Sequence, residues 1–286
     1  MFARNATMAA TILDGRVIAA AMHHRLLQEI AGLRAQAPTL GVLYFDTPAS
    51  TVYWRAQQQH AQALGIRAQS VAYPSSVAQQ SVEQQIHIWN ADPGVHGIFV
   101  HQPMPPQIDA ERISSLIDPR KDIEGIHPQH SARRFFAKAR IGSCTALAVM
   151  ELIESTHVDL AGTEAVVIGH SEIVGRPVSM LLLDRLATTT VCHVATQRLE
   201  EHVRRADVLV VAAGKPQLVR GEWVKPGAIV IDVGINVVGG HVVGDVEFSA
   251  AKERAAFITP VPGGVGPVTV MMVMKNTIEA VKLQQT

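Results

Sequence analysis

Strand candidates alternate with helix candidates along this chain, and this alternation is the feature that most restricts its fold. Segments with the length and composition of strands occupy 40–45, 66–73, 97–101, 164–169, 188–194, 208–213 and 228–234. Segments with apolar residues at helical spacing occupy 16–35, 48–65, 82–92, 145–157, 174–186, 199–206 and 268–282. Strands separated by helices predict βαβ units and mainly parallel sheets, so we expect an α/β fold.

The alternation falls into two series, which predicts two domains. A chain of 286 residues is long enough for two domains that each have a core. We expect the first domain to comprise residues 1–146 together with a returning C-terminal helix at 270–286. The second domain, residues 147–269, has the strand and helix order of a Rossmann-like dinucleotide-binding domain.

Composition and charge exclude several classes of protein. Apolar residues make up 48% and charged residues 17% of the chain, which indicates a globular protein rather than a disordered one. Basic and acidic residues number 25 each, so no global field attracts nucleic acid or an anionic membrane. Cys144, Cys192 and the 13 histidines show no metal-ligand spacing. With an N-terminus too short and weakly apolar for a signal peptide, we expect a cytoplasmic protein without a metal, nucleic-acid partner or membrane span.

Three glycine-rich or charged segments suggest binding sites, and each has a plainer alternative. VVIGHSEIVGRP (166–177) lies between a strand and a helix, where glycines let a pyrophosphate approach the helix N-terminus. Its spacing is not GxGxxG, and the alternative is an ordinary strand–helix turn. PVPGGVGP (260–267) is either a rigid ligand-binding loop or a domain-crossing turn. For DPRKDIEG (118–125), the residues alone favour charge decoration of a surface loop.

Together these segments resemble the methylenetetrahydrofolate dehydrogenase/methenyltetrahydrofolate cyclohydrolase family, often called FolD. The matching segments are ILDGRVIA, PASTVYW, GIFVHQPMP, KDIEGIHP, GSCTA, VVIGHSEIVGRP, AAGKP, GAIVIDVGIN, VGDV and ITPVPGGVGPVT. They follow the family's order and span nearly the whole chain. The resemblance implies a folate domain facing a nicotinamide domain, usually in a homodimer. It also implies two reactions, which are the oxidation of 5,10-methylenetetrahydrofolate by NAD or NADP and the hydrolysis of the resulting methenyl cation.

The resemblance also assigns roles to individual residues. The residues implied to act on the folate are Tyr53, Gln57, His101 and Glu124, and those implied to bind it are Tyr53, Glu124, Pro262, Gly263 and Gly264. The residues implied to bind the dinucleotide are Gly169, His170, Ser171, Ile173, Gly175, Arg176, Pro177, Ala213, Ile235 and Thr269.

Three folate-site positions depart from the family pattern. Gln57 stands where the family's Tyr-x-x-x-Lys has the lysine that is assigned to cyclohydrolase chemistry. His101 replaces the glutamine of VQLPLP, and Glu124 replaces the second aspartate of KDxDG. Hydrolysis of the methenyl cation needs proton transfer, which an amide cannot supply, whereas hydride transfer depends chiefly on alignment. We therefore expect a dehydrogenase whose cyclohydrolase activity is weak or absent.

Two alternatives remain open for these departures. His101 titrates near neutral pH as an imidazole, so it can rebuild the relay with Tyr53 and preserve both activities. The changed residues also fit a paralogue that binds a folate or nucleotide without turnover. Glu124 keeps a carboxylate but adds a methylene, which can shift the pterin ring by about a bond length and alter the folate substrate.

The cofactor positions favour NAD over NADP. NADP-using members carry arginine in GRS and Ser-Arg or Ser-Lys after the histidine that follows the next strand. Here these positions hold His170, Val194 and Ala195, so the fixed charge and two donors for a 2′-phosphate are missing. No acidic residue ends the strand either, so the usual reader of the NAD ribose is also missing.

Overall fold

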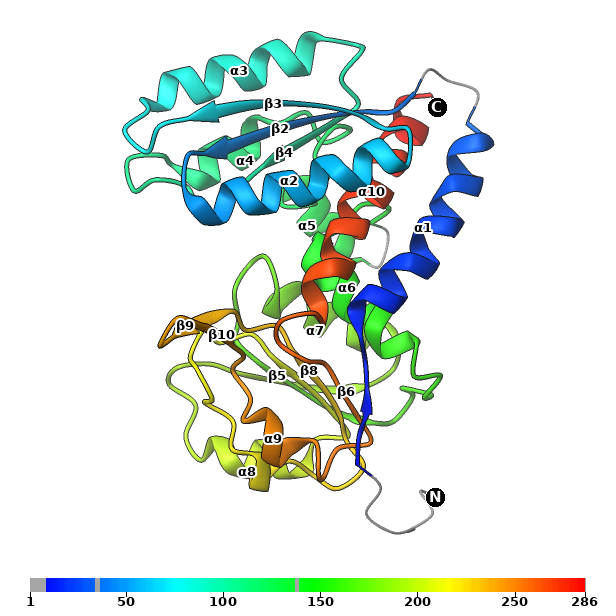
Figure 1. Ribbon diagram of the computed structural model, residues 1–286, viewed down its shortest axis with the longest axis vertical. Helices are drawn as coiled ribbons and strands as arrows, with labels where there is room; N and C mark the ends of the chain where they lie inside the picture. The colour runs from blue at the N-terminus through cyan, green and yellow to red at the C-terminus, as the bar shows by residue number, and fades with distance from the viewer. Residues whose placement is uncertain (1–8, 34–36, 137–138, 286) are drawn as a thin grey trace. The chain divides into compact units, whose positions relative to one another are not determined.

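The computed structural model describes residues 9–33, 37–136 and 139–285 and divides into two compact units (Figure 1). The three-stranded unit contains residues 20–144 and those from 270 onward. Of the described residues, the six-stranded unit contains 9–19 together with 145–269. Helices α1 (Gly15–Ala31) and α10 (Val265–Gln284) contribute residues to both units.

The three-stranded unit is a parallel sheet with the strand order β3-β2-β4. Its strands are β2 (Thr39–Phe45), β3 (Arg67–Tyr73) and β4 (Gly97–Val100), and its helices are α2 (Pro48–Ala63), α3 (Gln79–Ala91), α4 (Ala110–Leu116) and α5 (Pro128–Phe135). Figure 1 shows α2 and α3 on opposite faces of this sheet. Leu43 and Phe45 of β2 pack with Ile86 and Trp89 of α3 in the core.

Helix α2 explains why a glutamine is buried in this unit. Thr47 caps the helix by accepting the N–H of Ser50 on its side-chain oxygen, 3.2 Å away, and Pro48 suits the first turn. The buried residues Ser50, Trp54, Gln57 and Ala61 recur at helical spacing. The helix therefore places the Gln57 amide among core side chains.

The six-stranded unit is a parallel sheet with the order β1-β11-β8-β7-β5-β6. Its strands are β1 (Thr11–Ile12), β5 (Glu164–Ile168), β6 (Thr188–Cys192), β7 (Val208–Val211), β8 (Ile229–Asp232) and β11 (Phe257–Ile258), with a separate hairpin of β9 (Asn236–Val238) and β10 (His241–Val243). Its helices are α6 (Cys144–Glu154), α7 (Gly175–Asp184), α8 (Leu199–Arg205), α9 (Phe248–Ala251) and the 3₁₀ turn η1 (Gly221–Trp223). Strand β5 is followed by β6 on one side and β7 on the other. In sheets of this kind ligands bind at such a switch point, beyond the carboxyl ends of the strands.

The predicted α/β fold with mainly parallel sheets is confirmed, while the N-terminal domain boundary differs from the expectation. We expected residues 1–146 in the first domain, but β1 pairs with β11 and therefore belongs to the six-stranded unit. Residues 1–8 lie outside the described part of the chain. The sequence did not predict the short elements β1, α4, α5, β9, β10, α9 and β11, whose residues form neither a continuous apolar run nor a clear helical spacing.

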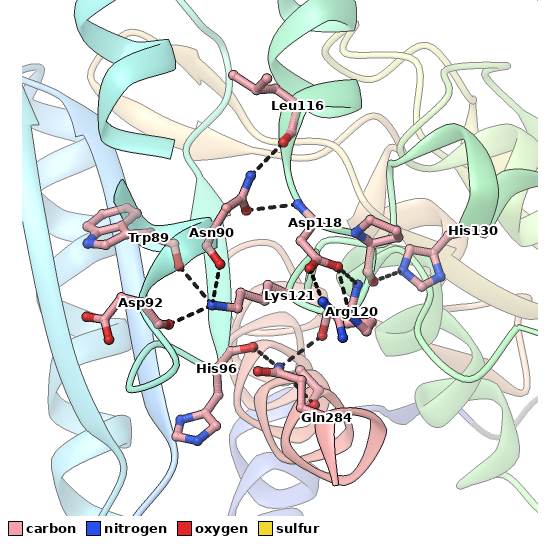
Figure 2. A network of polar contacts seen from close by, with 12 residues as sticks. Trp89, Asn90, Asp92, His96, Leu116, Asp118, Arg120, Lys121, His130 and Gln284 are labelled. Carbon is pink, nitrogen blue, oxygen red and sulfur yellow. Dashed lines mark hydrogen bonds and ion pairs between the residues drawn. The ribbon is translucent and has the colours of Figure 1, made fainter. Parts of the chain in front are cut away.

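Lys121 ties the end of α3 to the loop that leads toward Glu124 (Figure 2). Its ammonium donates to the main-chain carbonyl oxygens of Trp89, Asn90 and Asp92 at 2.8, 3.0 and 2.7 Å. These carbonyls belong to the last turn and end of α3, where a cation is favoured by the helix dipole. All three ammonium protons are therefore used in holding the structure.

The expectation of charge decoration on a surface loop is wrong for the core of DPRKDIEG. Lys121, Asp122 and Glu124 are only 4%, 0% and 6% exposed. Charged side chains are buried at such levels only when they are paired or when they serve a site. Lys121 is of the first kind, because its ammonium group is paired with three main-chain carbonyl oxygens.

We predict that Lys121→Met lowers the free energy of unfolding by about 3 kcal/mol, because buried carbonyl oxygens lose a charged donor. Urea denaturation measures this change. The matched control is Arg120→Met, which removes an exposed ion pair with Asp118 and is expected to cost less than about 1 kcal/mol. Equal losses in both variants would contradict a structural role specific to Lys121.

Candidate active site

Helix α2 and the end of β4 bring Gln57 and His101 into direct contact. His101 follows the last residue of β4, and its Nε2 lies 2.8 Å from Oε1 of Gln57. The two side chains are 0% and 1% exposed, Gln57 first. The ring of Tyr53, one helical turn before Gln57, lies 5.1 Å from the His101 ring between centroids. Three of the residues expected to act on the folate therefore form one cluster.

The Gln57–His101 contact fixes the chemistry of both groups. An amide oxygen only accepts hydrogen bonds, so His101 donates from a protonated Nε2. Burial lowers the pKa of His101 to about 4, so its ring is neutral at pH 7. The Nε2 of Gln57 has no hydrogen-bond partner among the described residues. The pair is thus uncharged, and its N–H₂ group makes no hydrogen bond of ordinary geometry there, although an interaction with the Gln57 side chain slightly lowers the pKa of Tyr53.

Asp122 positions Glu124 by holding the loop around it. Its Oδ1 accepts the main-chain N–H groups of Glu124 and Gly125 at 3.1 and 3.0 Å, and its Oδ2 accepts that of His127 at 2.8 Å. Gly125 has a φ of 67°, and a Cβ there would lie 2.5 Å from the carbonyl carbon of Gly142. This position therefore requires glycine. The turn buries the Glu124 carboxyl group at a defined point.

Glu124 shares its surroundings with Tyr53 and Cys144. Burial raises the pKa of Glu124 well above its ordinary value, and the neighbouring Asp122 carboxylate adds to this effect. Burial also raises the pKa of Tyr53 and of Cys144, with the charge of Glu124 as the second cause in each case. Oε2 of Glu124, like Nε2 of Gln57, has no hydrogen-bond partner in the described part of the chain. Buried polar atoms without partners are rare and favour a ligand that supplies the missing groups.

Cys144 and Asn276 support this site, and sequence reasoning gave neither a role there. The amide of Asn276 donates to the carbonyl oxygens of Ile123 and Gly142, both at 2.8 Å, and contacts the Cys144 sulfur at 3.3 Å. The thiol of Cys144 donates to the carbonyl of Ile123. The only sequence signal was an asparagine inside the apolar helix α10, and buried amides of this kind need partners.

In the six-stranded unit, Gly169 and Gly175 form a close turn between β5 and α7. Gly169 has a φ of 113°, and a Cβ on Gly175 would lie 2.0 Å from the Gly169 carbonyl oxygen. Ser171 accepts the N–H of Val174 on its hydroxyl oxygen at 3.2 Å. This places the N-terminus of α7 beside the carboxyl end of β5, where a helix favours anions. The turn fits the pyrophosphate of a dinucleotide.

The remaining residues expected around the dinucleotide surround this turn in different ways. Arg176 is exposed and pairs with Glu172, while Ile173 and Pro177 are partly buried. The exposed rings of His170 and His193 lie 5.4 Å apart at the carboxyl ends of β5 and β6. Val194 and Ala195, which follow His193, are also exposed. No fixed positive charge therefore stands at His170, Val194 or Ala195, which follow β5 and β6.

Ala213, Ile235 and Thr269 differ in what they can offer a ligand. The N–H of Ala213 already donates to Oδ2 of Asp245 at 2.6 Å. Ile235 is 72% exposed, and the hydroxyl of Thr269 donates to the carbonyl of Val265. Ala213 and Ile235 can therefore offer a ligand their exposed surfaces. The Thr269 hydroxyl, which already donates, can still accept a hydrogen bond.

The loop at PVPGGVGP packs on the start of α1. The N–H of Gly15 donates to the carbonyl oxygen of Gly263 at 2.8 Å, and a Cβ on Gly15 would lie 1.7 Å from the Gly264 carbonyl oxygen. Pro262 precedes this contact, and Gly263 has a φ of 104°. Pro262, Gly263 and Gly264 belong to the six-stranded unit, whereas Tyr53 and Glu124 belong to the three-stranded unit.

Two kinds of feature are absent from residues 9–33, 37–136 and 139–285. No group of three or more histidine, cysteine, aspartate or glutamate side chains is arranged there to hold a metal ion. No helix in those ranges is long and apolar enough to cross a membrane.

Known proteins resemble this chain over almost its full length. The family model described as tetrahydrofolate dehydrogenase/cyclohydrolase, catalytic domain, matches residues 13–124, and the corresponding NAD(P)-binding domain matches residues 143–285. The bifunctional protein FolD 2 of Geobacter sulfurreducens is 44% identical over 96% of this chain and 98% of its own length.

Solved structures agree with these sequence matches. Bifunctional FolD from Campylobacter jejuni superposes with a TM-score of 0.92 at 37% identity, over 96% of this chain and 100% of its own. The Trypanosoma brucei enzyme, complexed with NADP and an inhibitor, gives a TM-score of 0.93 at 40% identity, over 97% and 99% of the two chains.

The buried imidazole of His101 predicts a specific acid sensitivity. Since the pKa of His101 is about 4 in the folded chain and about 6.5 in an unfolded one, the unfolded chain binds more protons between these values. The contribution of the neutral His101 ring to the unfolding free energy is therefore fully present above pH 6.5. It is lost as the pH falls from 6.5 through 4. We expect the wild type to lose about 3 kcal/mol of unfolding free energy over this range that His101→Gln retains.

Urea denaturation of both proteins at pH 7.5 and pH 4 measures this difference. His241→Gln is the matched control, because it removes an exposed imidazole on the β9–β10 hairpin and should leave the acid sensitivity unchanged. Identical pH dependence in the wild type and His101→Gln would show that this ring is not held neutral by burial.

Proposed function

Because the chain belongs to the tetrahydrofolate dehydrogenase/cyclohydrolase family, we propose that it oxidises 5,10-methylenetetrahydrofolate with NAD(P) and hydrolyses the methenyl product weakly or not at all. The observation that carries this proposal is the neutral, buried Gln57–His101 pair. It stands where, by resemblance to the family, a lysine serves the cyclohydrolase reaction.

Hydride transfer does not require a proton-transfer group at this position. The methylene carbon gives up a hydride with its electron pair and the folate becomes a cation, so no proton has to move. NAD(P), when bound, supplies the hydride acceptor. The residues of the chain then have to orient the folate and exclude water. Tyr53, Gln57 and Glu124 are suited to orientation, because their polar groups lie in one buried cluster.

Hydrolysis of the methenyl cation requires what this cluster lacks. Water must lose a proton as it attacks, and a ring nitrogen must gain one as the bridge opens. Gln57 does not titrate, and the low pKa of His101 leaves almost no imidazolium to donate at pH 7. The raised pKa of Tyr53 keeps its hydroxyl from acting as a base. Losing a positioned proton-transfer group costs roughly 10²–10⁴-fold in rate.

A relay through His101 is the second candidate, because its ring contacts both Tyr53 and Gln57. Its neutral form can in principle accept a proton, but the burial that lowers its pKa makes it a weak base. A paralogue without turnover is a third candidate. The close Gly169–Gly175 turn argues against it, since a protein that only binds folate would have little need of a dinucleotide turn.

We propose that Gly169, Ser171 and Gly175 hold the dinucleotide and that NAD is preferred to NADP. The preference is supported by the exposed Val194 and Ala195 after β6, which offer no charge for a 2′-phosphate.

A homodimer is the assembly that the family resemblance implies, and we propose it for this chain. Strand β6 ends the six-stranded sheet, and no strand of the described ranges pairs with its outer edge. Leu183, Leu186 and Val191 beside this edge are 52%, 74% and 38% exposed. An unpaired edge bordered by apolar side chains supports a partner surface there.

The proposed function is tested by following both steps in one cuvette. Purified protein receives methylenetetrahydrofolate with NAD or with NADP, while reduced nicotinamide and methenyltetrahydrofolate are measured separately. We expect methenyltetrahydrofolate to accumulate and to decay at the enzyme-free rate, with the higher kcat/KM for NAD. Enzyme-accelerated decay would favour the His101 relay, and no reduced nicotinamide with either cofactor would favour a changed substrate or a binding protein.

Gln57→Lys extends this test. Restoring an ammonium group at the buried position should accelerate methenyl decay by about 10-fold or more. Gln58→Lys is the matched control, because it adds the same group at the next, exposed position of α2.

The dimer has its own test in sedimentation velocity at several protein concentrations. We expect the wild type to sediment as a dimer and Leu186→Glu to sediment as a monomer, because the charge would be buried in the interface. Val52→Glu places the same charge at an exposed valine of α2, 67% exposed, and should leave the dimer intact. A monomeric wild type would rule out the proposed assembly.

A further inference from the structure

The orientation of the Gln57 amide carries a further inference, which rests on the proposed function. His101 Nε2 lies 2.8 Å from Gln57 Oε1, and the Gln57 Nε2 is buried without a partner among the described residues. We propose that His101 is a positioning residue that locks the Gln57 amide, so that its N–H₂ group is presented to the folate as a fixed, neutral hydrogen-bond donor.

An amide on its own does not choose between donating and accepting. The last torsion of glutamine is broad and nearly two-fold, so rotation exchanges the oxygen and the N–H₂ group. The His101 N–H selects the orientation in which the oxygen points toward the ring. The opposite orientation requires His101 to change tautomer, with its Nε2 accepting and its proton on Nδ1.

The His101 ring is itself held by aromatic neighbours. The rings of Tyr53, Phe99 and Tyr44 have centroids 5.1, 5.6 and 5.8 Å from that of His101. Their planes are inclined to it at 50°, 89° and 44°. Such packing leaves few rotamers for the imidazole and surrounds it with carbon. His101 is therefore suited to orient a neighbouring group, whereas a group that exchanges protons needs a path for them.

The unused donor defines the ligand chemistry that it recognises. An N–H₂ group requires an acceptor with a free lone pair, such as a bridge nitrogen of methylenetetrahydrofolate. In the methenyl cation the lone pairs of both bridge nitrogens are delocalised into the N–C–N system. Gln57 thus favours the substrate over the product as a hydrogen-bond partner, and it places no formal charge beside the cation that forms.

NMR of the wild type and two substitutions of His101 test whether this residue orients the Gln57 amide. The ¹⁵N chemical shifts of the ring nitrogens report the tautomer, and the His101 signals are assigned by their loss in His101→Gln. His101→Met fills the space without an N–H, whereas His101→Gln keeps a donor for Gln57. We expect a protonated Nε2 in the wild type. We also expect KM for methylenetetrahydrofolate to rise roughly 10-fold or more in His101→Met, with KM for NAD changed less than about two-fold, because the lost hydrogen bond is made to the bound substrate.

Rescue separates positioning from a merely structural role. His101→Gln should recover most of the affinity for methylenetetrahydrofolate that His101→Met loses, and Gln57→Met should lose as much affinity as His101→Met. The double variant should then lose no more than either single one, because the two residues act as a unit. Losses that add, or equal losses in His101→Met and His101→Gln, would overturn the proposal. A proton on Nδ1 of His101 would overturn it without any variant, so the test survives if His101→Met does not fold.

The two proposals fail in different ways. If the wild type produces no reduced nicotinamide, the proposed function fails. The tautomer still tests the locked amide in that case, and isothermal titration with tetrahydrofolate tests whether His101→Met weakens folate binding and His101→Gln restores it. If the wild type is active but His101→Met is unimpaired, the positioning role fails alone.

Discussion

Buried aspartates that accept main-chain N–H groups hold the functional loops of both units. Asp122 binds three such groups around Glu124. In the six-stranded unit, Asp232 binds those of Gly234, Asp245 and Val246, and Asp245 binds those of Ala213 and Gly214. Loops at the ends of parallel strands have no ladder to satisfy their amides, so a buried carboxylate replaces it. The shape of each site depends on these bonds.

The difference between scaffold and site is a difference in hydrogen-bond satisfaction. Lys121 uses all three ammonium protons, and both oxygens of Asp122 accept main-chain N–H groups, so both side chains serve to hold the backbone. Gln57 and Glu124 are buried just as deeply, yet each keeps one polar atom without a partner in the described ranges. Such atoms are costly in a folded protein, and they are explained when a ligand completes them.

Periodicity was sufficient to predict the α/β fold and the longer elements, because each spans several repeats of its pattern. It was insufficient for the two-residue strands β1 and β11, whose pairing places β1 in the six-stranded unit. The roles proposed for Gln57 and His101 came from resemblance to a family, and their contact came only from the structure. Lys121 shows most clearly what the sequence could not predict. Nothing in DPRKDIEG indicates that carbonyl oxygens at the end of α3 accept the hydrogen bonds of its buried ammonium group.

The neutral Gln57–His101 pair affects oxidation and hydrolysis differently, because the first reaction transfers a hydride and the second transfers protons. Hydride transfer creates positive charge on the folate, and a neutral amide beside that charge opposes it less than an ammonium group would. Hydrolysis of the cation must instead move protons, and an amide does not titrate while an imidazole with a pKa of about 4 is a weak base and is almost never protonated near pH 7. In the proposed function, the same burial that makes the pair a rigid support for hydride transfer leaves it almost no imidazolium to donate for hydrolysis at pH 7.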